Sequence, residues 1–478
     1  MISTKIIATI GPASDSVETI EKMYKAGMRV ARLNFSHGDY DYFKKLVRNI
    51  RKVSENIAIM LDTKGPEIRS GEVENGEIEL SDEDKLVCTN KIVVGNNKSL
   101  TINYKDLDKL KKGDKILIDD GLIECEVISS GKVGVKVRVL NGGKLGSRKT
   151  VSLKGHSANL IFLSTKDRKD IMFAIENYFD FVAASFVRKA ADVMSIYRLL
   201  RKNNSRMRII SKIEHWEAIE NLDEICHLSQ GIMVARGDLG VEIPMEHVPR
   251  VQKDLIRRCN ELGKPVIVAT QMLESMKDNP RPTRAEISDV AQAILDGTDA
   301  IMLSGETAGG KYPVKAVSMM ASIAREYEKE VNVDIMDTLH HKLDLKKNDI
   351  SLFVTKSAAL ASDELPNSVI ITPTETGYSA RKVSRFRPKV PIYAMTRDMT
   401  ILRQLQMSWG VFPFMALKNF KSVDEMIYSI VSFADKNGLL KGYDKAIITS
   451  GHNLTSGKTN SVEIYNISTV LKNLKAKK

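Results

Sequence analysis

The sequence predicts an α/β protein: a (β/α)8 TIM barrel that carries an inserted small β-barrel lid domain and is followed by a C-terminal α/β domain. Three observations lead to this prediction. Eight short apolar runs alternate with helical segments, one connection between them is far longer than the others, and the alternation resumes after a charged linker. A chain of 478 residues is also too long for one ordinary core, so two or three domains are expected.

The eight apolar runs have the composition of parallel strands that are covered on both faces. They read KIIATIG, MRVARLNFS, IAIMLDT, FDFVAASF, MRIISKIE, GIMVARGD, PVIVATQM and DAIMLSGE. A helical segment with start and stop signals lies between most of them. The first, SDSVETIEKMYKAG, offers Ser14 and Ser16 as caps and ends at Gly27. Eight such units indicate a TIM barrel. A doubly wound sheet would need a nucleotide fingerprint after its first strand, and ATIGPAS is not one.

The long connection follows the third run and indicates a small inserted β domain over residues 66–155. It contains short alternating segments such as GEIEL, KILIDD, GLIECEVI and KVGVKVRVL, separated by turn residues. It leaves from the C-terminal end of the third strand, which is the end of a barrel where active sites form. We therefore expect a lid over the site, with the barrel made of residues 1–65 and 156–335.

A charged linker, VNVDIMDTLHHKLDLKKND, precedes the last segment. From residue 350 to 478 the pattern is α/β again, with strand-like runs SVIITPT, VPIYAMT and KAIITSG.

Composition excludes several classes of protein. The formal charge is +12, but the lysines are mixed with acidic residues and aromatics are only 6%, so nucleic-acid binding is not expected and attraction of small anions fits better. No apolar stretch reaches the length of a membrane span, and the N-terminus has no signal-peptide core. The four cysteines are scattered and predict reduced thiols, hence a cytoplasmic protein without zinc or disulfides.

Polar side chains gather at the C-terminal ends of the predicted barrel strands. One such residue alone is more often a turn or helix cap than a ligand, and one Lys–Glu pair is more often structural. Closure of the barrel, however, brings all these ends onto one small circle, which capping does not explain. The residues are Arg32, Asn34, Ser36, Asp62, Thr63, Lys212, Glu214, Asp238, Thr270, Ser304 and Glu306.

Glu214 and Asp238, on adjacent strands, offer carboxylates to one Mg2+ whose remaining ligands are water and substrate. Lys212 lies on the same side of its strand as Glu214 and can stabilise charge that develops during reaction. Arg32 and Arg69 add cations suited to phosphate oxygens. This combination indicates phosphoryl transfer.

Two segments resemble phosphate-binding loops without matching them. GETAGGKY has Tyr312 where a P-loop needs Ser or Thr, and SGKT near the C-terminus lacks the correct glycine spacing. His37 in NFSHG is a candidate base, although a loop histidine near a nucleotide is the commoner arrangement.

The sequence resembles the pyruvate kinase family, both at the residues named above and in longer motifs along essentially the whole chain. The shared motifs include KIIATIGPAS, VARLNFSHG, MLDTKGPEIRSG, IISKIE, MVARGDLGVEIP, ATQMLESM and PRPTRAEISDVAQAILDGTDAIMLSGETAGGKYPV. The resemblance implies a barrel, a lid after the third strand and a C-terminal α/β domain. It implies transfer of a phosphoryl group from phosphoenolpyruvate to ADP, with Mg2+ (or Mn2+) and K+ as cofactors, in a homotetramer.

The resemblance also assigns roles to residues. Lys212 matches the lysine that stabilises the enolate, and Glu214 and Asp238 match the Mg2+ ligands. Thr270 and Ser304 become candidates for the proton path. The other sets are the following: phosphoenolpyruvate contacts at Arg32, Lys212, Gly237, Asp238 and Thr270; a K+ site at Asn34, Ser36, Asp62 and Thr63; and nucleotide contacts at Asn34, Phe35, Ser36, His37, Arg69 and Lys149.

The sequence departs from the family pattern at the exit of the lid, where Lys154 and Asn159 occupy hinge positions in VSLKGHSANLIFLS. Two alternatives stay open. Another barrel enzyme of phosphoenolpyruvate or pyruvate, such as a lyase, would lack an ADP-binding lid. A catalytically silent regulatory relative would lack some of the matched residues.

Two further expectations follow from the resemblance. Glu67, in GPEIR, goes with dependence on K+. The loop TPTETGYSAR sets the hydroxyls of Thr374, Thr376 and Ser379 before a helix and matches the family's site for a phosphorylated effector. Its Glu375 would repel a phosphate, so we expect no strong activation by fructose 1,6-bisphosphate and at most a response to a monophosphate.

Overall fold

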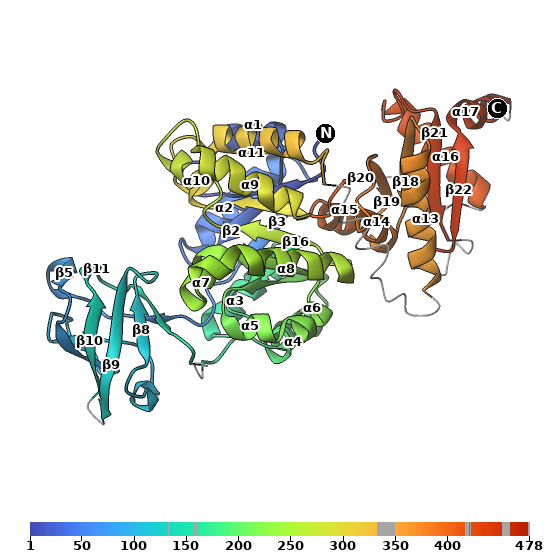
Figure 1. Cartoon of the computed structure of the whole chain (residues 1–478). Coiled ribbons are helices and arrows are strands. Elements are labelled where there is room, and N and C mark those ends of the chain that lie inside the picture. Colours follow the sequence, from blue (N-terminus) through green and yellow to red (C-terminus); the bar gives the residue numbers. More distant parts are fainter. Residues whose placement is uncertain are drawn as a thin grey trace.

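A computed structural model describes residues 1–131, 134–156, 160–331, 349–415, 420, 422–451 and 459–476. The chain forms three bodies in a row, with the barrel in the centre, the lid domain on one side and the C-terminal domain on the other (Figure 1). Of the residues discussed above, Asn159 and residues 456–458 of the SGKT segment lie outside the described residues.

The barrel is closed by eight parallel strands, and each of the eight predicted runs supplies one of them, which confirms the predicted fold class. Around the barrel the order is β1, β17, β16, β15, β14, β13, β3 and β2, and Lys5 of the first strand faces Ala300 of the last. The strands are β1 (Lys5–Thr9), β2 (Met28–Asn34), β3 (Ala58–Asp62), β13 (Phe181–Ala184), β14 (Arg208–Ile213), β15 (Gly231–Ala235), β16 (Val266–Ala269) and β17 (Ala300–Leu303).

Alternation along the strands divides the apolar side chains between two cores. In β14, Ile210 belongs to the cluster that fills the barrel, whereas Ile209 and Ile213 pack outward against the helices. Lys212, two residues after Ile210, therefore lies on the inner side at the open end of the barrel.

Helices cover the outside of the barrel. Ser16 caps the first of them by accepting a hydrogen bond from the Thr19 amide, and Gly27 ends it at φ 133°. Ser14, the other predicted cap, instead accepts from the Gly11 amide. The helices are α1 (Val17–Ala26), α2 (Tyr40–Val53), α3 (Thr165–Glu176), α4 (Ala190–Lys202), α5 (Trp216–Glu220), α6 (Leu222–Leu228), α7 (Arg236–Glu242), α8 (Val248–Leu262), α9 (Arg284–Leu295), α10 (Gly305–Ala308) and α11 (Pro313–Tyr327).

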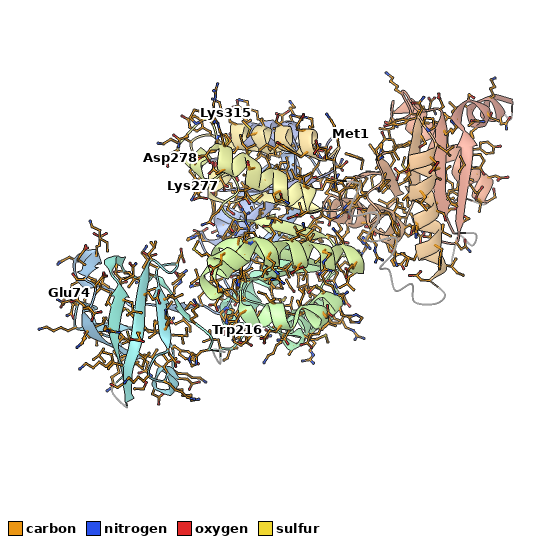
Figure 2. The ribbon with its side chains drawn as sticks, viewed as in Figure 1. Met1, Glu74, Trp216, Lys277, Asp278 and Lys315 are labelled. Carbon is orange, nitrogen blue, oxygen red and sulfur yellow. The ribbon has the colours of Figure 1, made fainter. Side chains whose placement is uncertain are left out.

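The lid domain has its own hydrophobic core and is built from a seven-stranded and a two-stranded sheet. In the larger sheet the order is β4, β12, β8, β9, β10, β6, β7, and the smaller one pairs β11 with β5. The strands are β4 (Ile68–Arg69), β5 (Glu77–Leu80), β6 (Lys85–Thr89), β7 (Ser99–Thr101), β8 (Lys115–Ile118), β9 (Ile123–Gly131), β10 (Gly134–Asn141), β11 (Gly143–Gly146) and β12 (Thr150–Leu153). Figure 2 labels Glu74 on this domain and Trp216 on the barrel that it adjoins.

The C-terminal domain is a five-stranded sheet with helices on its faces, and its order is β20, β19, β18, β21, β22. The last strand is antiparallel to β21 and the others run parallel. The strands are β18 (Ser368–Pro373), β19 (Ile392–Thr396), β20 (Val411–Met415), β21 (Lys445–Ser450) and β22 (Ser461–Asn466), and the helices are α13 (Ile350–Glu364), α14 (Tyr378–Ser384), α15 (Met399–Leu405), α16 (Val423–Lys436) and α17 (Ile467–Ala476).

This domain closes the end of the barrel opposite the lid. Met407, just after α15, packs into the cluster that fills the barrel. Arg387 forms a bidentate ion pair with Asp299 at the start of β17, at 3.1 and 2.9 Å. Both side chains are buried, so the two domains are joined by a desolvated charge pair.

Within the described parts of the chain, no helix combines the length and the apolar character that crossing a membrane requires.

Candidate active site

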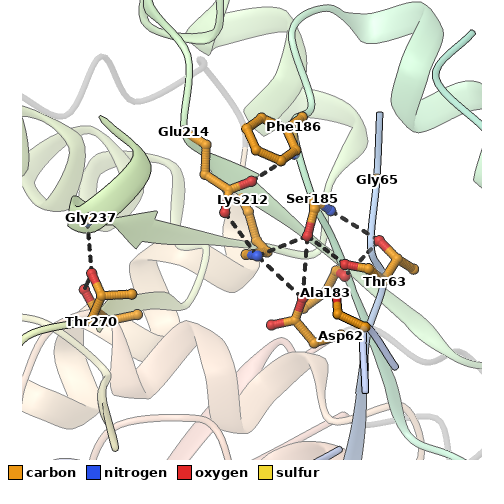
Figure 3. A network of polar contacts seen from close by, with 12 residues as sticks. Asp62, Thr63, Gly65, Ala183, Ser185, Phe186, Lys212, Glu214, Gly237 and Thr270 are labelled. Carbon is orange, nitrogen blue, oxygen red and sulfur yellow. Dashed lines mark hydrogen bonds and ion pairs between the residues drawn. The ribbon is translucent and has the colours of Figure 1, made fainter. Parts of the chain in front are cut away.

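The centre of the candidate site is the buried ammonium of Lys212. Its Nζ lies 2.8 Å from Oε1 of Glu214 and 3.2 Å from Oδ1 of Asp62, and it donates to Oγ of Ser185 at 2.8 Å (Figure 3). Strands β14, β3 and β13 supply these four residues or the positions directly after them. The predicted meeting of the strand ends therefore does occur around Lys212.

Electrostatics keep Lys212 charged. Burial on its own would lower the pKa of Lys212, but the charges of Asp62 and Glu214 outweigh burial and raise the pKa above its usual value. The ammonium is thus a fixed positive charge at neutral pH, which is the state required for stabilising an anion.

Asp62 also holds Arg32. The Arg32 Nε donates to Oδ2 of Asp62 at 2.6 Å, and Nη1 donates to the Thr9 hydroxyl at 2.8 Å. Burial opposes ionisation of Asp62, but Arg32 and Lys212 together lower its pKa. One carboxylate thus fixes two cations side by side at the mouth of the barrel.

Ser185 is a member of the network that the sequence analysis did not identify. It is buried, it accepts from Lys212, and its hydroxyl is within hydrogen-bonding distance of Asp62 Oδ1 (3.2 Å) and the Thr63 carbonyl (2.7 Å). Its amide donates to the Thr63 hydroxyl at 3.1 Å. Ser185 follows the fourth barrel strand, so the same rule that selected the other strand ends would have found it.

Glu214 and Asp238 form a carboxylate pair suited to a divalent cation. Oε2 of Glu214 accepts from the Phe186 amide at 2.7 Å, whereas the buried Oε1 accepts no hydrogen bond and has only the ion pair with Lys212. Burial raises the pKa of Glu214 to about 8, and the charge of Asp238 acts in the same direction while Lys212 opposes it. Burial likewise raises the pKa of Asp238.

These observations fit a hard cation, because a positive charge would relieve the repulsion between the buried Glu214 carboxylate and the half-buried Asp238 carboxylate. Among the residues that the structure describes, no group of three or more His, Cys, Asp or Glu side chains could hold a metal. The two carboxylates of Glu214 and Asp238 suit the coordination preference of Mg2+, which usually takes few protein ligands and completes its shell with water and substrate.

Thr270 has an unusual backbone at the end of β16. Its φ is 68°, in the left-handed region that a β-branched residue rarely adopts. Its hydroxyl accepts from the Gly237 amide at 2.9 Å (Figure 3) and donates to the Ala269 carbonyl at 2.6 Å. Arg236 donates to the Thr270 carbonyl. Such strain is characteristic of functional sites, and it aims the hydroxyl at the start of α7, beside Asp238.

The two predicted polar residues after β17 differ in their surroundings. The buried hydroxyl of Ser304 has no hydrogen-bond partner. Glu306 is fully buried, and its carboxylate accepts from the Leu273 amide at 3.1 Å and the Ser304 amide at 2.7 Å. The Ser304 hydroxyl is therefore free to bond to a substrate. The Glu306 carboxylate instead fixes the backbone of the loops after β16 and β17.

Asn34, Phe35 and His37, at and just after the end of β2, differ in their surroundings. Asn34 faces Asp62 in the register of β2 and β3, and its Oδ1 accepts from the Ser36 amide at 3.1 Å. The ring of Phe35 is buried and stacks on Phe43 at 3.8 Å, so a nucleotide could meet only its main chain. His37 is exposed.

The lid side of the site carries Arg69 and Lys149. Arg69 pairs with Glu67 through Nε at 2.7 Å and donates to the Arg148 carbonyl at 2.8 Å. Lys149 pairs with Asp119 at 3.0 Å. A cleft between lid and barrel is lined by residues of both, namely Pro66, Glu67, Ile68, Leu117, Asp120, Thr150, Val151, Ser152, Leu153, His156, Leu160, Phe186, Arg188, His215, Asp238, Val241 and Glu242.

The candidate effector residues lie far from this site, in the loop between β18 and α14. Thr374 is buried and its amide donates to the Met395 carbonyl at 2.8 Å. The Ser379 hydroxyl is bonded to that of Thr459. Thr376 is exposed, and Gly377, at φ 74°, caps α14.

Comparisons with known proteins agree with this geometry. The family model "Pyruvate kinase, barrel domain" matches residues 1–317, and "Pyruvate kinase, alpha/beta domain" matches residues 353–465. The chain is 46% identical to the pyruvate kinase of Bacillus licheniformis over 98% of this chain and 81% of that protein. It is 45% identical to that of Clostridium acetobutylicum, over 97% and 99%. A crystal structure of a pyruvate kinase from Cryptosporidium parvum superimposes with a TM-score of 0.92 at 38% identity, covering 98% of this chain and 96% of that chain.

Proposed function

The chain belongs to the pyruvate kinase family, and we propose that the network around Lys212 is the catalytic centre of this phosphotransferase. The reaction moves a phosphoryl group from phosphoenolpyruvate to ADP and gives pyruvate and ATP. The observation that supports the site best is a buried, permanently charged ammonium held between Asp62 and Glu214 at the open end of the barrel.

Lys212 stabilises the enolate that forms when the phosphoryl group leaves. Because Asp62, Glu214 and Ser185 hold its ammonium in place, little reorganisation is needed as the negative charge develops. Arg32, fixed beside it by Asp62, faces the phosphoryl oxygens of phosphoenolpyruvate with its planar fork.

Glu214 and Asp238 are the residues that would hold Mg2+ or Mn2+. When bound, the ion neutralises charge on the phosphoryl and enolate oxygens. The rest of the binding site comes from Gly237 and Thr270, whose amide and hydroxyl already contact each other at 2.9 Å.

A proton must reach the enolate carbon to complete pyruvate. The hydroxyls of Thr270 and Ser304 are the candidates for this path. Ser304 has a buried hydroxyl without a partner, and Thr270 is aimed by a strained backbone. Both lie at the end of the barrel that carries Lys212.

A monovalent cation fits the neighbouring set Asn34, Ser36, Asp62 and Thr63, which is rich in oxygen atoms. ADP would bind between lid and barrel, and the family resemblance assigns its phosphates to Arg69 and Lys149 of the lid and its remaining contacts to residues 34–37 of the barrel.

Three further properties are part of the proposal. A phosphorylated effector would bind near Thr374, Thr376 and Ser379. The protein would be a homotetramer, as is usual in the family, and it would be cytoplasmic, in line with four buried, free cysteines.

The test is formation of pyruvate from phosphoenolpyruvate by the full chain with Mg2+ and K+, followed through a coupled assay with and without ADP. The proposal expects pyruvate only when ADP is present, with ATP formed in equal amount. Pyruvate without ADP would indicate a lyase or phosphatase, and no turnover at all would indicate a silent relative.

A further inference from the structure

The side chain of Glu242 reaches from the barrel to the lid. Glu242 is the last residue of α7, and its Oε1 accepts a hydrogen bond of 2.6 Å from the hydroxyl of Ser152 in the lid strand β12. The two residues are 90 positions apart in the chain, and both line the cleft between lid and barrel. The contact therefore joins two separately folded domains beside the candidate active site.

The lid and the barrel do not share a hydrophobic core. The buried core of the lid runs from Ile68 to Leu153, and among the described residues it includes none of the barrel. Figure 1 shows the lid standing to one side of the barrel. Because no common core fixes the orientation of the lid, that orientation depends on polar contacts such as the one between Ser152 and Glu242.

The barrel orients the Glu242 carboxylate from the other side. Nε2 of His215 lies 3.3 Å from Oε2 of Glu242. Nδ1 of His215 accepts from the Glu217 amide at 3.2 Å, so the proton of the neutral ring is on Nε2 and faces the carboxylate. Burial lowers the pKa of His215 to about 4, which keeps the ring neutral. One oxygen of Glu242 thus faces the lid and the other faces the histidine.

The lid position of this structure, called closed below, is stabilised only moderately by this contact. Burial raises the pKa of Glu242 to about 7. The Ser152 hydrogen bond and the charge of Lys154 oppose this rise, while Glu217 adds to it. Lys154 is the residue of the lid exit at which the sequence departs from the family pattern. A carboxylate whose desolvation is only partly offset makes a bond that can form and break.

The contact links the two sides of the candidate site. Asp238, the candidate Mg2+ ligand, lies four residues before Glu242 in α7, so both side chains lie on one face of that helix. On the lid, β12 pairs with β4, which carries Arg69, and Lys149 directly precedes β12. The bond between Ser152 and Glu242 therefore helps to set the distance between the lid cations and the barrel carboxylates.

We propose that Glu242 is a positioning residue that holds the lid closed by accepting a hydrogen bond from Ser152. Its consequence for catalysis rests on the proposed function, in which Arg69 and Lys149 of the lid bind the nucleotide while residues of the barrel bind phosphoenolpyruvate. When the closed state is less populated, the apparent affinity for ADP falls with it, whereas phosphoenolpyruvate binding is little changed.

The first experiment measures the position of the lid without any turnover. Nitroxide labels are attached through Glu74→Cys on the lid and Asp278→Cys on the barrel, two exposed residues that Figure 2 labels, and the four native cysteines are buried. Pulsed electron paramagnetic resonance then gives the distances between the labels in the full chain without ligands. Ser152→Ala should raise the ratio of open to closed distances by about threefold or more.

A matched set of variants assigns the effect to this bond. Ser152→Thr keeps a hydroxyl and should keep the wild-type distances, as should Ser129→Ala at an exposed position of β9. Glu242→Leu should open the lid as Ser152→Ala does, and the double variant should open it no further, because both substitutions remove the same bond.

Two results of this experiment would overturn the proposal. Identical distances in the wild type, Ser152→Ala and Glu242→Leu would show that the contact does not hold the lid. Additive opening in the double variant would show that the two side chains act separately.

The second experiment separates positioning from a merely structural role through the Michaelis constants of the same variants. KM for ADP should rise about threefold in Ser152→Ala and Glu242→Leu, while KM for phosphoenolpyruvate changes less than about twofold, and Ser152→Thr should restore the wild-type value. A fall in kcat with both KM values unchanged would contradict the proposal. Absence of turnover in the wild type would refute the proposed function instead, and the label distances would still decide the role of Glu242.

Discussion

The hydroxyl of Ser185 lies 2.8 Å from the ammonium of Lys212 and joins it to the end of β3. This contact helps to hold the ammonium beside the Asp62 carboxylate, which also pairs with Arg32. The position of the lysine is thus set from three neighbouring strands, β3, β13 and β14, rather than by its own rotamer alone.

Ser185→Ala should reduce kcat about tenfold. A hydrogen bond to a charged group contributes about 1.5–3 kcal/mol, and loss of part of that from the transition state corresponds to such a factor. Steady-state kinetics would show kcat falling while the apparent affinity for Mg2+ stays the same. Ser288→Ala, on an exposed face of α9, is the matched control. An unchanged kcat would show that Ser185 does not position Lys212.

Lys212→Met should lose most turnover while the protein still binds Mg2+, because the positive charge is needed chiefly in the transition state. We expect kcat below about a tenth of the wild-type value, which is one logarithmic unit of rate. Calorimetric titration would check Mg2+ binding, and Lys22→Met on exposed α1 serves as the control. Retention of more than a tenth of kcat would remove Lys212 from its assigned role.

Replacement of K+ by tetramethylammonium at equal ionic strength should reduce activity strongly. In the family pattern a glutamate at the place of Glu67 goes with dependence on K+, and this carboxylate has Arg69 at 2.7 Å and Lys64 at 3.9 Å as partners. A fixed ammonium can take the place of a bound cation, so Glu67→Lys should restore part of the activity without K+. Equal rates of the wild type in the two salts would contradict this expectation.

Fructose 1,6-bisphosphate should not activate strongly. Glu375 lies in the effector loop and forms an exposed pair with Arg397, so its repulsion of a phosphate is about 1 kcal/mol in a partly solvated loop. Phosphoenolpyruvate saturation curves with millimolar bisphosphate should coincide with the curve without effector, and AMP should shift the curve at most slightly. Glu375→Gln should become more responsive. A large leftward shift of the wild-type curve with the bisphosphate would exclude this role for Glu375.

Stability should rise with pH in the alkaline range because of Lys5. Burial, followed by the charge of Arg29, lowers the pKa of Lys5 to about 7 in the folded protein. Between that value and its ordinary value of 10.5, the unfolded chain binds a proton that the folded chain lacks, so the free energy of unfolding increases with pH, by at most about 1.4 kcal/mol per pH unit.

Urea unfolding of the wild type and Lys5→Met at several pH values from 7 to 10 measures this slope. The variant should lack the contribution of Lys5, so the wild-type curve should climb more steeply. Lys25→Met, exposed on α1, should keep the wild-type slope. Parallel curves for Lys5→Met and the wild type would show that Lys5 keeps its proton when folded.

Much of the fold could be predicted because each barrel strand is covered on both faces and reads as an apolar run. The buried apolar runs also made Lys212 and Glu214 predictable, because charged residues are unexpected at the end of such a run. Residues two apart lie on one side of a strand, so these two could be expected to act together. Small, uncharged residues of the site were harder to predict from the sequence. Ser185 lies between Ala184 and Phe186 and carries no charge that would mark it.

Other features depend on contacts that local sequence does not show. Glu306 was grouped with the strand-end residues, but its carboxylate turns toward the backbone amides of Leu273 and Ser304. The Arg387–Asp299 pair joins residues far apart in the chain, and each alone looks like an ordinary surface charge. Only docking of the C-terminal domain makes the arginine buried.

The insertion of the lid between β3 and α3 has a consequence for synthesis of the protein on the ribosome. When the lid strands β4 to β12 have emerged, they can pair among themselves, whereas the barrel then has only β1, β2 and β3. β1 must wait for β17 to close the ring, and Met407 must arrive later still to fill its base. During translation the nascent chain would therefore carry a finished lid on three unclosed, apolar barrel strands, which is the stage at which a chaperone would be most needed.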